Sequence, residues 1–192
     1  LPVTLSSGAV THIFALAHCG AMGTLNRNRK KNSSLDTQIE DWKRIVPFIQ
    51  SNAPENRPYV ICHMVTSLDG KVTGKFLYEP QCEKATDLYY QINRDYKADG
   101  FACGRVTMEG SFTGGWYPDL TAFKGIRVPE EDFIADPEAR FFAVAFDRKG
   151  RLGWKSYKKE DEDLGYDKAQ IIEVLTEQVD KRYLSYLQSE NI

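Results

Sequence analysis

The sequence contains few cysteines, and none of them lie close together. Its four cysteines (Cys19, Cys62, Cys82 and Cys103) are scattered over 192 residues without a Cys-x-x-Cys pair. Closely spaced cysteines are the usual signature of zinc sites and of disulfide frameworks, so we expect neither. Cys62 and Cys103 lie within apolar runs and are predicted to be buried thiols. This usage is typical of a reducing compartment and predicts a cytoplasmic location.

Long apolar runs and an excess of basic charge are also missing. No segment approaches the ~18 consecutive apolar residues of a membrane-spanning helix, so no membrane association is expected. The formal net charge is −2, which excludes a global positive field that would attract nucleic acid. Apolar residues nevertheless make up 42% of the chain and aromatic residues 12%, which is enough for a globular domain with a core.

The first 34 residues differ from the rest of the chain. They end in a basic polar stretch, residues 26–34, which is typical of a solvated linker. A contact with nucleic acid through the basic residues 27–31 is the alternative interpretation. We predict a leader or extension of unknown role over residues 1–34 and one domain over residues 35–192.

Predicted strands and helices alternate along the second part of the chain. This alternation is typical of the α/β class with a largely parallel sheet. A strand over 58–66 is apolar on both faces and is expected to be central and buried. A turn over 147–150 is expected to return residues 151–154 as a hairpin arm. The other predicted elements are strands over 100–103, 141–146 and 170–175, and helices after Ser34 (apolar stripe Ile39, Trp42, Val46 and Ile49), over 82–97, from Arg105 and after Asp180.

Polar residues follow the first of these strands directly. Residues 67–71 read Ser-Leu-Asp-Gly-Lys, so the strand ends at a hydroxyl, a carboxylate and an ammonium group. In open α/β sheets, ligands bind at the carboxyl ends of the strands. Such a sequence is also common in tight turns in which the aspartate bonds its own backbone. His63 shares a strand face with Ser67 and reaches a ligand only if that face lines a cleft.

A second polar turn follows the strand over 100–103. Gly104, Arg105 and Thr107 open the next helix, where backbone N–H groups, a guanidinium and a hydroxyl suit an anion such as phosphate. An ordinary tight turn explains the glycine equally well. The aromatic pair Trp116 and Tyr117, in the glycine-rich loop that follows, suits stacking on a planar ring or a hydrophobic plug.

Together these motifs resemble a known family. The motifs are the turn over 67–71, the segment 99–107 (Asp-Gly-Phe-Ala-Cys-Gly-Arg-x-Thr), the tetrad 118–121 (Pro-Asp-Leu-Thr) and the segment 147–152 (Asp-x-x-Gly-Arg-Leu). In this order they are similar to the reductase domain of riboflavin biosynthesis, the C-terminal half of the bacterial deaminase-reductase. The resemblance covers residues 57–192 and implies a dihydrofolate reductase-like three-layer sandwich with a mostly parallel central sheet.

The resemblance implies an NADPH-dependent reductase that transfers hydride to a pyrimidine-type or related small heterocyclic or carbonyl substrate. Family roles place Asp69, Ser67 and His63 at the catalytic centre, and Gly104, Arg105, Thr107 and Thr73 at the cofactor. Trp116 and Leu120 are the expected substrate contacts. The family also implies a homodimer with a small-molecule substrate and no metal. The working hypothesis is that two neighbouring strand ends, those before Asp69 and Arg105, together hold the dinucleotide.

The chain departs from the family at several positions. His63 stands where the bifunctional enzymes often carry a lysine, while Trp116 and Phe123 replace charged residues that hold a ribose phosphate. Family members also continue beyond the position of Ile192, so the domain over 35–192 is expected to be incomplete and truncated at its C-terminus. A non-catalytic nucleotide-binding or assembly module on the same fold is the alternative function.

Overall fold

The computed structural model describes residues 12–17 (backbone only), 58–67, 69–129, 131–156, 163 and 165–192. Their main elements are strands β1 (His12–Ala17), β2 (Tyr59–Met64), β3 (Gly100–Gly104), β4 (Phe142–Phe146) and β5 (Gln170–Val174), and helices α2 (Glu83–Tyr96), α3 (Arg105–Met108) and α4 (Lys181–Ser189). Short 3₁₀ turns cover Lys75–Tyr78, Pro80–Cys82 and Leu120–Phe123, and a π-helical turn covers Glu109–Thr113. The predicted helix after Ser34 lies outside the described residues.

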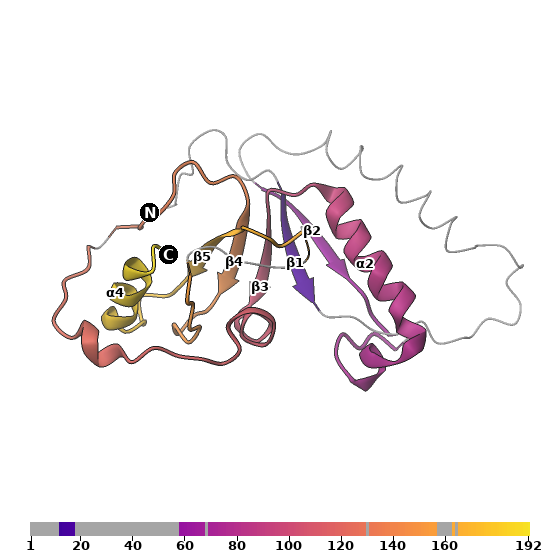
Figure 1. Cartoon of the computed structure of the whole chain (residues 1–192), viewed down its shortest axis with the longest axis horizontal. Helices are drawn as coiled ribbons and strands as arrows, with labels where there is room; N and C mark the ends of the chain where they lie inside the picture. The colour runs from indigo at the N-terminus through magenta and orange to yellow at the C-terminus, as the bar shows by residue number, and fades with distance from the viewer. Residues whose placement is uncertain (1–11, 18–57, 68, 130, 157–162, 164) are drawn as a thin grey trace, which may run out of the picture.

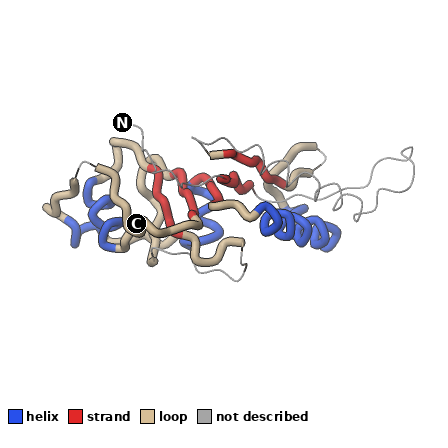
Figure 2. The backbone as a smooth tube through the Cα atoms, turned by 90° about the horizontal axis from the view of Figure 1, so that it is seen from above, coloured by secondary structure: helices blue, strands red, loops and turns tan. Residues whose placement is uncertain are grey.

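The five strands form one sheet in the order β2-β1-β3-β4-β5. Every pairing in this sheet is parallel, which confirms the α/β class and the parallel core. Figure 1 shows the strands side by side, with α2 near the β2 end and α4 near the β5 end. Figure 2 shows the same separation of the two helices from above. Because all strands are parallel, their carboxyl ends lie together at one edge of the sheet and their amino ends at the opposite edge.

Helix α2 agrees with the helix predicted over 82–97. Tyr89 and Tyr96 are buried on the side of the helix that meets the sheet, as expected for an amphipathic helix. Lys97 ends the helix in the left-handed conformation (φ 49°), and its N–H donates to the carbonyl of Arg94. Helix α4 likewise begins as predicted, because the Asp180 carboxylate accepts a hydrogen bond from the N–H of Arg182 at 2.9 Å.

The hydrophobic core lies between one face of β3, β4 and β5 and the segments that follow these strands. Phe101, Ala143, Ala145 and Ile171 point into it from the strands, and each is less than 5% exposed. Parallel sheets bury both faces of their central strands, which explains these short, nearly continuous apolar runs. The other buried core residues are Ile61, Tyr96, Cys103, Met108, Leu152, Trp154, Tyr166, Ala169, Tyr183, Tyr186 and Leu187.

The placement of β2 corrects the prediction of a central buried strand. β2 lies at one edge of the described sheet and pairs with β1. Its burial alternates, because Ile61 and His63 face α2 while Val60 (63% exposed) and Met64 lie on the opposite face. Cys62 shares that opposite face and is exposed, so the prediction of a buried Cys62 thiol is wrong. Cys103 is buried as predicted.

The predicted hairpin arm over 151–154 is also wrong. The turn itself forms, with the N–H of Gly150 donating to the carbonyl of Asp147 at 3.1 Å. Residues 151–154 then form no strand, because side chains hold their backbone. The carbonyl of Leu152 accepts from the Tyr183 hydroxyl at 2.7 Å, and the carbonyl of Trp154 accepts from the Tyr186 hydroxyl. Side-chain partners thus replace a strand ladder in this segment.

Strand β1 connects the N-terminal region with the sheet. Its backbone pairs with β2 over the full length of both strands and with β3 through the residues opposite Gly100, Phe101 and Ala102. Residues 12–17 therefore belong to the sheet, although the sequence analysis places them in a leader over residues 1–34.

Candidate functional site

The carboxyl edge of the sheet carries both polar turns singled out in the sequence. The chain passes from β1 outward to β2 and then returns across β1 to β3, so the direction of winding reverses between β1 and β3. Ligands of open parallel sheets bind at such a reversal, beyond the carboxyl ends of the strands. Figure 1 shows α3 at the end of β3, on the same edge from which the chain leaves β2. Gly104 and Arg105 therefore lie at the reversal point.

The polar turn over residues 67–71 is closed by its own backbone and hydroxyl groups. The N–H of Ser67 donates to the carbonyl of Lys71 at 2.9 Å, and the N–H of Lys71 donates to Ser67 Oγ at 2.8 Å. Gly70 has a φ of 79°, in the left-handed region that glycine adopts without strain. These hydrogen bonds close the turn, and the Asp69 side chain in it is exposed to solvent.

Asp69 is held as a carboxylate by its two neighbours in the turn. Lys71 Nζ lies 2.7 Å from Asp69 Oδ2, and the Ser67 hydroxyl donates to Asp69 Oδ1. The bond with Lys71 is the larger cause and the Ser67 hydroxyl the smaller, and together they lower the pKa of Asp69 to about 2. An acid of this strength is ionised near neutral pH, so Asp69 can accept hydrogen bonds or stabilise positive charge but cannot donate a proton.

The second polar turn, which follows β3, has free space beside Gly104 and a guanidinium, that of Arg105, in an ion pair. A Cβ added at Gly104 would meet no atom within 4 Å, so the backbone there is open to a ligand. The Arg105 guanidinium forms an ion pair with Glu109 one helical turn later. Thr107 is half-buried beside them, and Thr73, the last predicted cofactor residue, is exposed after the first turn. The residue types fit a phosphate, but Glu109 competes for Arg105.

His63 is packed against α2, away from the polar turn. Its ring stacks on Tyr89 with centroids 4.3 Å apart, and its Nε2 lies 3.0 Å from the Tyr89 carbonyl oxygen. Burial lowers the pKa of His63, although the hydrogen bond with the Tyr89 backbone partly offsets that effect. These contacts give His63 a packing role between strand and helix, and its catalytic role stays a prediction.

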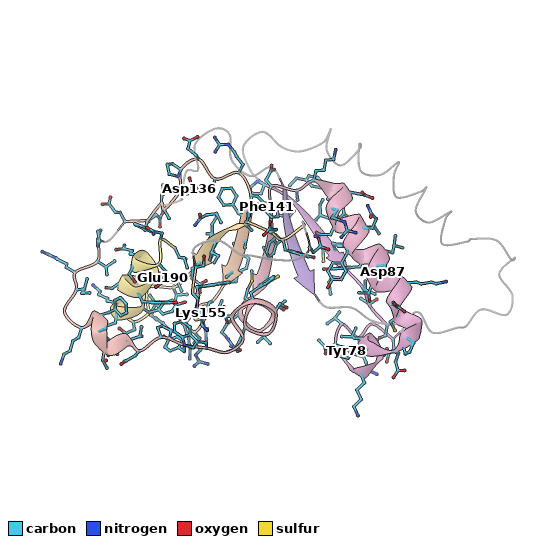
Figure 3. The ribbon with its side chains drawn as sticks, in the orientation of Figure 1. Tyr78, Asp87, Asp136, Phe141, Lys155 and Glu190 are labelled. Atoms are coloured by element: carbon cyan, nitrogen blue, oxygen red, sulfur yellow. The ribbon has the colours of Figure 1, made fainter. Side chains whose placement is uncertain are left out.

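The predicted substrate residues Trp116 and Leu120 lie toward the opposite end of the sheet. Trp116 is 40% exposed, and Lys155 Nζ lies 5.1 Å from the centroid of its ring. Leu120 begins a 3₁₀ turn that Asp119 caps through the N–H of Thr121 at 2.9 Å. Figure 3 shows Lys155, the neighbour of Trp116, on the other side of α3 from Tyr78, which follows the polar turn.

The structure therefore separates the predicted site residues into two groups. The turns of Asp69 and Arg105 share the carboxyl edge, as predicted, but the hypothesis that their strands are neighbours is wrong because β1 lies between them. Trp116 and Leu120 do not join this group, and His63 packs on Tyr89 of α2.

A carboxyl pair at the ends of β4 and β5, Asp147 and Glu173, was not predicted from the sequence. Asp147 is 1% exposed and accepts hydrogen bonds from the backbone N–H groups of Arg151 and of Leu152, the latter at 2.9 Å. Glu173 accepts from Trp154 Nε1 at 2.8 Å, and the Tyr183 hydroxyl lies 3.2 Å from it. An acid inside the apolar run of residues 171–174 was the signal that could have identified Glu173.

Glu173 is protonated at neutral pH because of its surroundings. Burial is the main cause, and the neighbouring Asp147 carboxylate adds to it, so that the pKa of Glu173 rises to about 8. Trp154 and Tyr183 oppose the rise by hydrogen bonding. The pair has an evident structural task, because it holds the segment 147–154 against β5 and α4.

Two hollows lie away from the carboxyl edge. The first, of about 320 Å³, lies among the end of α2 and the starts of β3 and β4, and the second, of about 520 Å³, follows the outer side of α2. In the described ranges, no group of three or more His, Cys, Asp or Glu residues is arranged to hold a metal ion. None of the helices described combines the length and hydropathy needed to cross a membrane.

Comparison with known proteins yields no matching family model, no matching curated protein and no matching solved structure.

Proposed function

We propose that this chain is an NADPH-dependent reductase of the riboflavin-pathway type, with a dihydrofolate reductase-like three-layer fold. Its substrate would be a pyrimidine-type or related small heterocyclic or carbonyl compound. The observation that carries the proposal is the position of the two polar turns, those of Asp69 and Arg105, at one edge of a parallel sheet beside its winding reversal. The sequence motifs at both turns resemble those of this family in order and in residue type.

The cofactor phosphates would be held by the turn after β3. Its backbone is open at Gly104, and Arg105 and Thr107 offer a guanidinium and a hydroxyl. Binding of a phosphate at Arg105 requires Glu109 to give up its ion pair or to share it. When bound, the cofactor supplies the hydride, and the protein aligns it with the acceptor.

Asp69 would orient the substrate ring at the other turn. An ionised carboxylate accepts hydrogen bonds from ring N–H groups and stabilises positive charge that develops beside it. Lys71 and Ser67 already hold the Asp69 carboxylate, so its position requires no rearrangement when substrate binds. Because Asp69 cannot donate a proton near neutral pH, the proton that follows hydride transfer comes from solvent.

Titration of the full chain with NADPH, followed by nicotinamide fluorescence, tests the cofactor step. Arg105→Ala should weaken NADPH binding by about 1–3 kcal/mol. Glu109→Gln is the matched variant, since it releases Arg105 from its ion pair and should leave binding equal or tighter. Equal affinity for NADPH in the wild type and in Arg105→Ala would refute the proposed phosphate contact.

A hydride-transfer assay with pyrimidine, pterin and simple carbonyl substrates tests the chemical step. Asp69→Asn should lower turnover with only a small loss of cofactor affinity, because Asp69 lies at the substrate side of the proposed site. Unchanged turnover in Asp69→Asn would place the reaction elsewhere.

A non-catalytic nucleotide-binding or assembly module is the second candidate. It is favoured by the packing role of His63 and by the distance along the sheet between the polar turn and Trp116. NADPH binding without turnover of any of these substrates would support the module and reject the reductase.

The proposal includes a cytoplasmic homodimer. β2 lies at the edge of the described sheet and presents Val60, Cys62 and Met64 on an exposed face. Exposed strand edges readily pair with a second chain. Light scattering of the purified chain would show the mass of a dimer, whereas the mass of a monomer at all concentrations would reject this part of the proposal.

A further inference from the structure

The hollow of about 320 Å³ is a cavity at the amino edge of the sheet, opposite the two polar turns. Figure 3 shows Phe141, one of its walls, at the edge of the sheet away from Tyr78 and Lys155. Its volume is at the lower end of the range for cavities that bind small molecules. The lining residues are Asn93, Arg94, Lys97, Ala98, Gly100, Phe101, Phe141 and Gly165.

Asn93 presents a side-chain amide to this cavity. The residue is only 6% exposed. Its Nδ2 atom points toward Gly165, where a Cβ would approach it to 2.9 Å. An amide N–H at this position can donate a hydrogen bond to a ligand in the cavity.

Two cations flank this amide. Arg94 forms an ion pair with Asp163, and Arg94 Nη1 lies 2.7 Å from Asp163 Oδ2. Lys97 follows directly after α2 and forms no ion pair with a described residue. Lys97 therefore leaves a net positive charge at the rim, and the Asn93 amide supplies a donor inside.

The remaining walls are apolar and partly aromatic. Phe101 is buried beneath the cavity, and Phe141 and Ala98 contribute further carbon surface. A flat ring can lie against such walls while a charged group reaches Lys97 and Asn93. From these features we infer that the cavity binds a small carboxylate built on one planar ring, at a site separate from the proposed reductase site.

Titration of the full chain with benzoate and with benzamide, its neutral counterpart, tests this inference by amide NMR shifts. Benzoate should bind with a Kd of about 1 mM or tighter and shift the amide signals of Gly100 and Gly165, without shifting that of Gly104. Lys97→Asn keeps a residue that tolerates the left-handed conformation and removes the charge. It should weaken benzoate about tenfold and leave benzamide unchanged.

A second variant tests the amide without changing any charge. Gly165→Ala adds a methyl group 2.9 Å from Asn93 Nδ2 and should weaken both probes. Asp132→Ala, an exposed change outside the cavity, should alter neither. The inference is overturned if benzoate binds Lys97→Asn as tightly as the wild type, if the shifts map to Gly104, or if no binding occurs at about 10 mM.

Discussion

The two ends of the sheet use acidic residues in opposite ways. At the β2 end, Asp69 is exposed and is kept ionised by Lys71 and Ser67. At the β4–β5 end, Glu173 is half-buried beside Asp147 and is kept protonated. The first acid is presented to a ligand, whereas the second holds backbone in place. The opposite pKa shifts of these two acids follow from exposure beside a cation in one case and from desolvation in the other.

The surroundings of the two ends explain this difference. β2 is an edge strand with one face exposed, so water solvates the charges that follow it. β4 and β5 lie beside the core, where Trp154, Tyr183 and Tyr186 exclude water. Burial of a carboxylate without compensation is unfavourable, so desolvation favours the protonated form of Glu173.

The largest expected effect comes from Asp147→Ala. This change leaves the buried N–H groups of Arg151 and Leu152 without their acceptor and should lower the free energy of unfolding by about 3 kcal/mol. Urea unfolding measures the change, with the exposed Asp132→Ala as control. If Asp147→Ala lowers the free energy of unfolding no more than Asp132→Ala does, Asp147 does not stabilise the fold and the comparison with Asp69 is wrong.

Gly153→Ala tests how closely the loop of Trp116 packs on the β4–β5 end. A Cβ at Gly153 would lie 2.0 Å from the Trp116 carbonyl oxygen, and we expect a loss of about 1–3 kcal/mol. Gly110→Ala is the matched control, because a Cβ there meets nothing within 4 Å. Thermal unfolding that shifts equally in both variants would contradict the close contact.

The pH dependence of stability should show the protonated state of Glu173. Its pKa in the folded protein, about 8, is above the ordinary value of 4.5, so the folded state binds the proton more tightly than the unfolded state. Its contribution is complete below 4.5 and is lost as the pH rises through about 8. Glu173→Gln should flatten the alkaline part of the stability curve, and an unchanged curve would contradict the assignment.

His63 should give a smaller effect of opposite sign. Burial lowers its pKa from 6.5, so its contribution is present above that value and is lost as the pH falls through the lower, folded-state pKa. The rings of Tyr89 and Tyr96 lie against it. His63→Phe keeps a stacked ring and should reduce the loss of stability at acid pH. Urea unfolding below pH 6.5 measures this loss in both proteins. An equal loss in the variant and the wild type would exclude His63 as its source.

Local signals in the sequence were sufficient for most of the elements. Helix α4 follows from the capping Asp180 and its apolar period, and α2 from the spacing of Tyr89 and Tyr96. The polar turn over 67–71 and the turn at Gly104 could also be recognised, because strand, glycine and polar residues are adjacent in the chain. Each of these features depends on interactions within a few residues.

Contacts between distant residues decided the rest. The chain order alone did not show that β2 is an edge strand, that His63 packs on Tyr89, or that Asp147 meets Glu173. Residues 151–154 form no hairpin arm. The hydroxyls of Tyr183 and Tyr186, some thirty positions later, donate hydrogen bonds to the carbonyls of this segment. The sequence by itself determined which short segments become helix, strand or turn. Only the tertiary structure decided which charges are solvated, since the dielectric surroundings of a side chain depend on what packs against it from elsewhere in the chain.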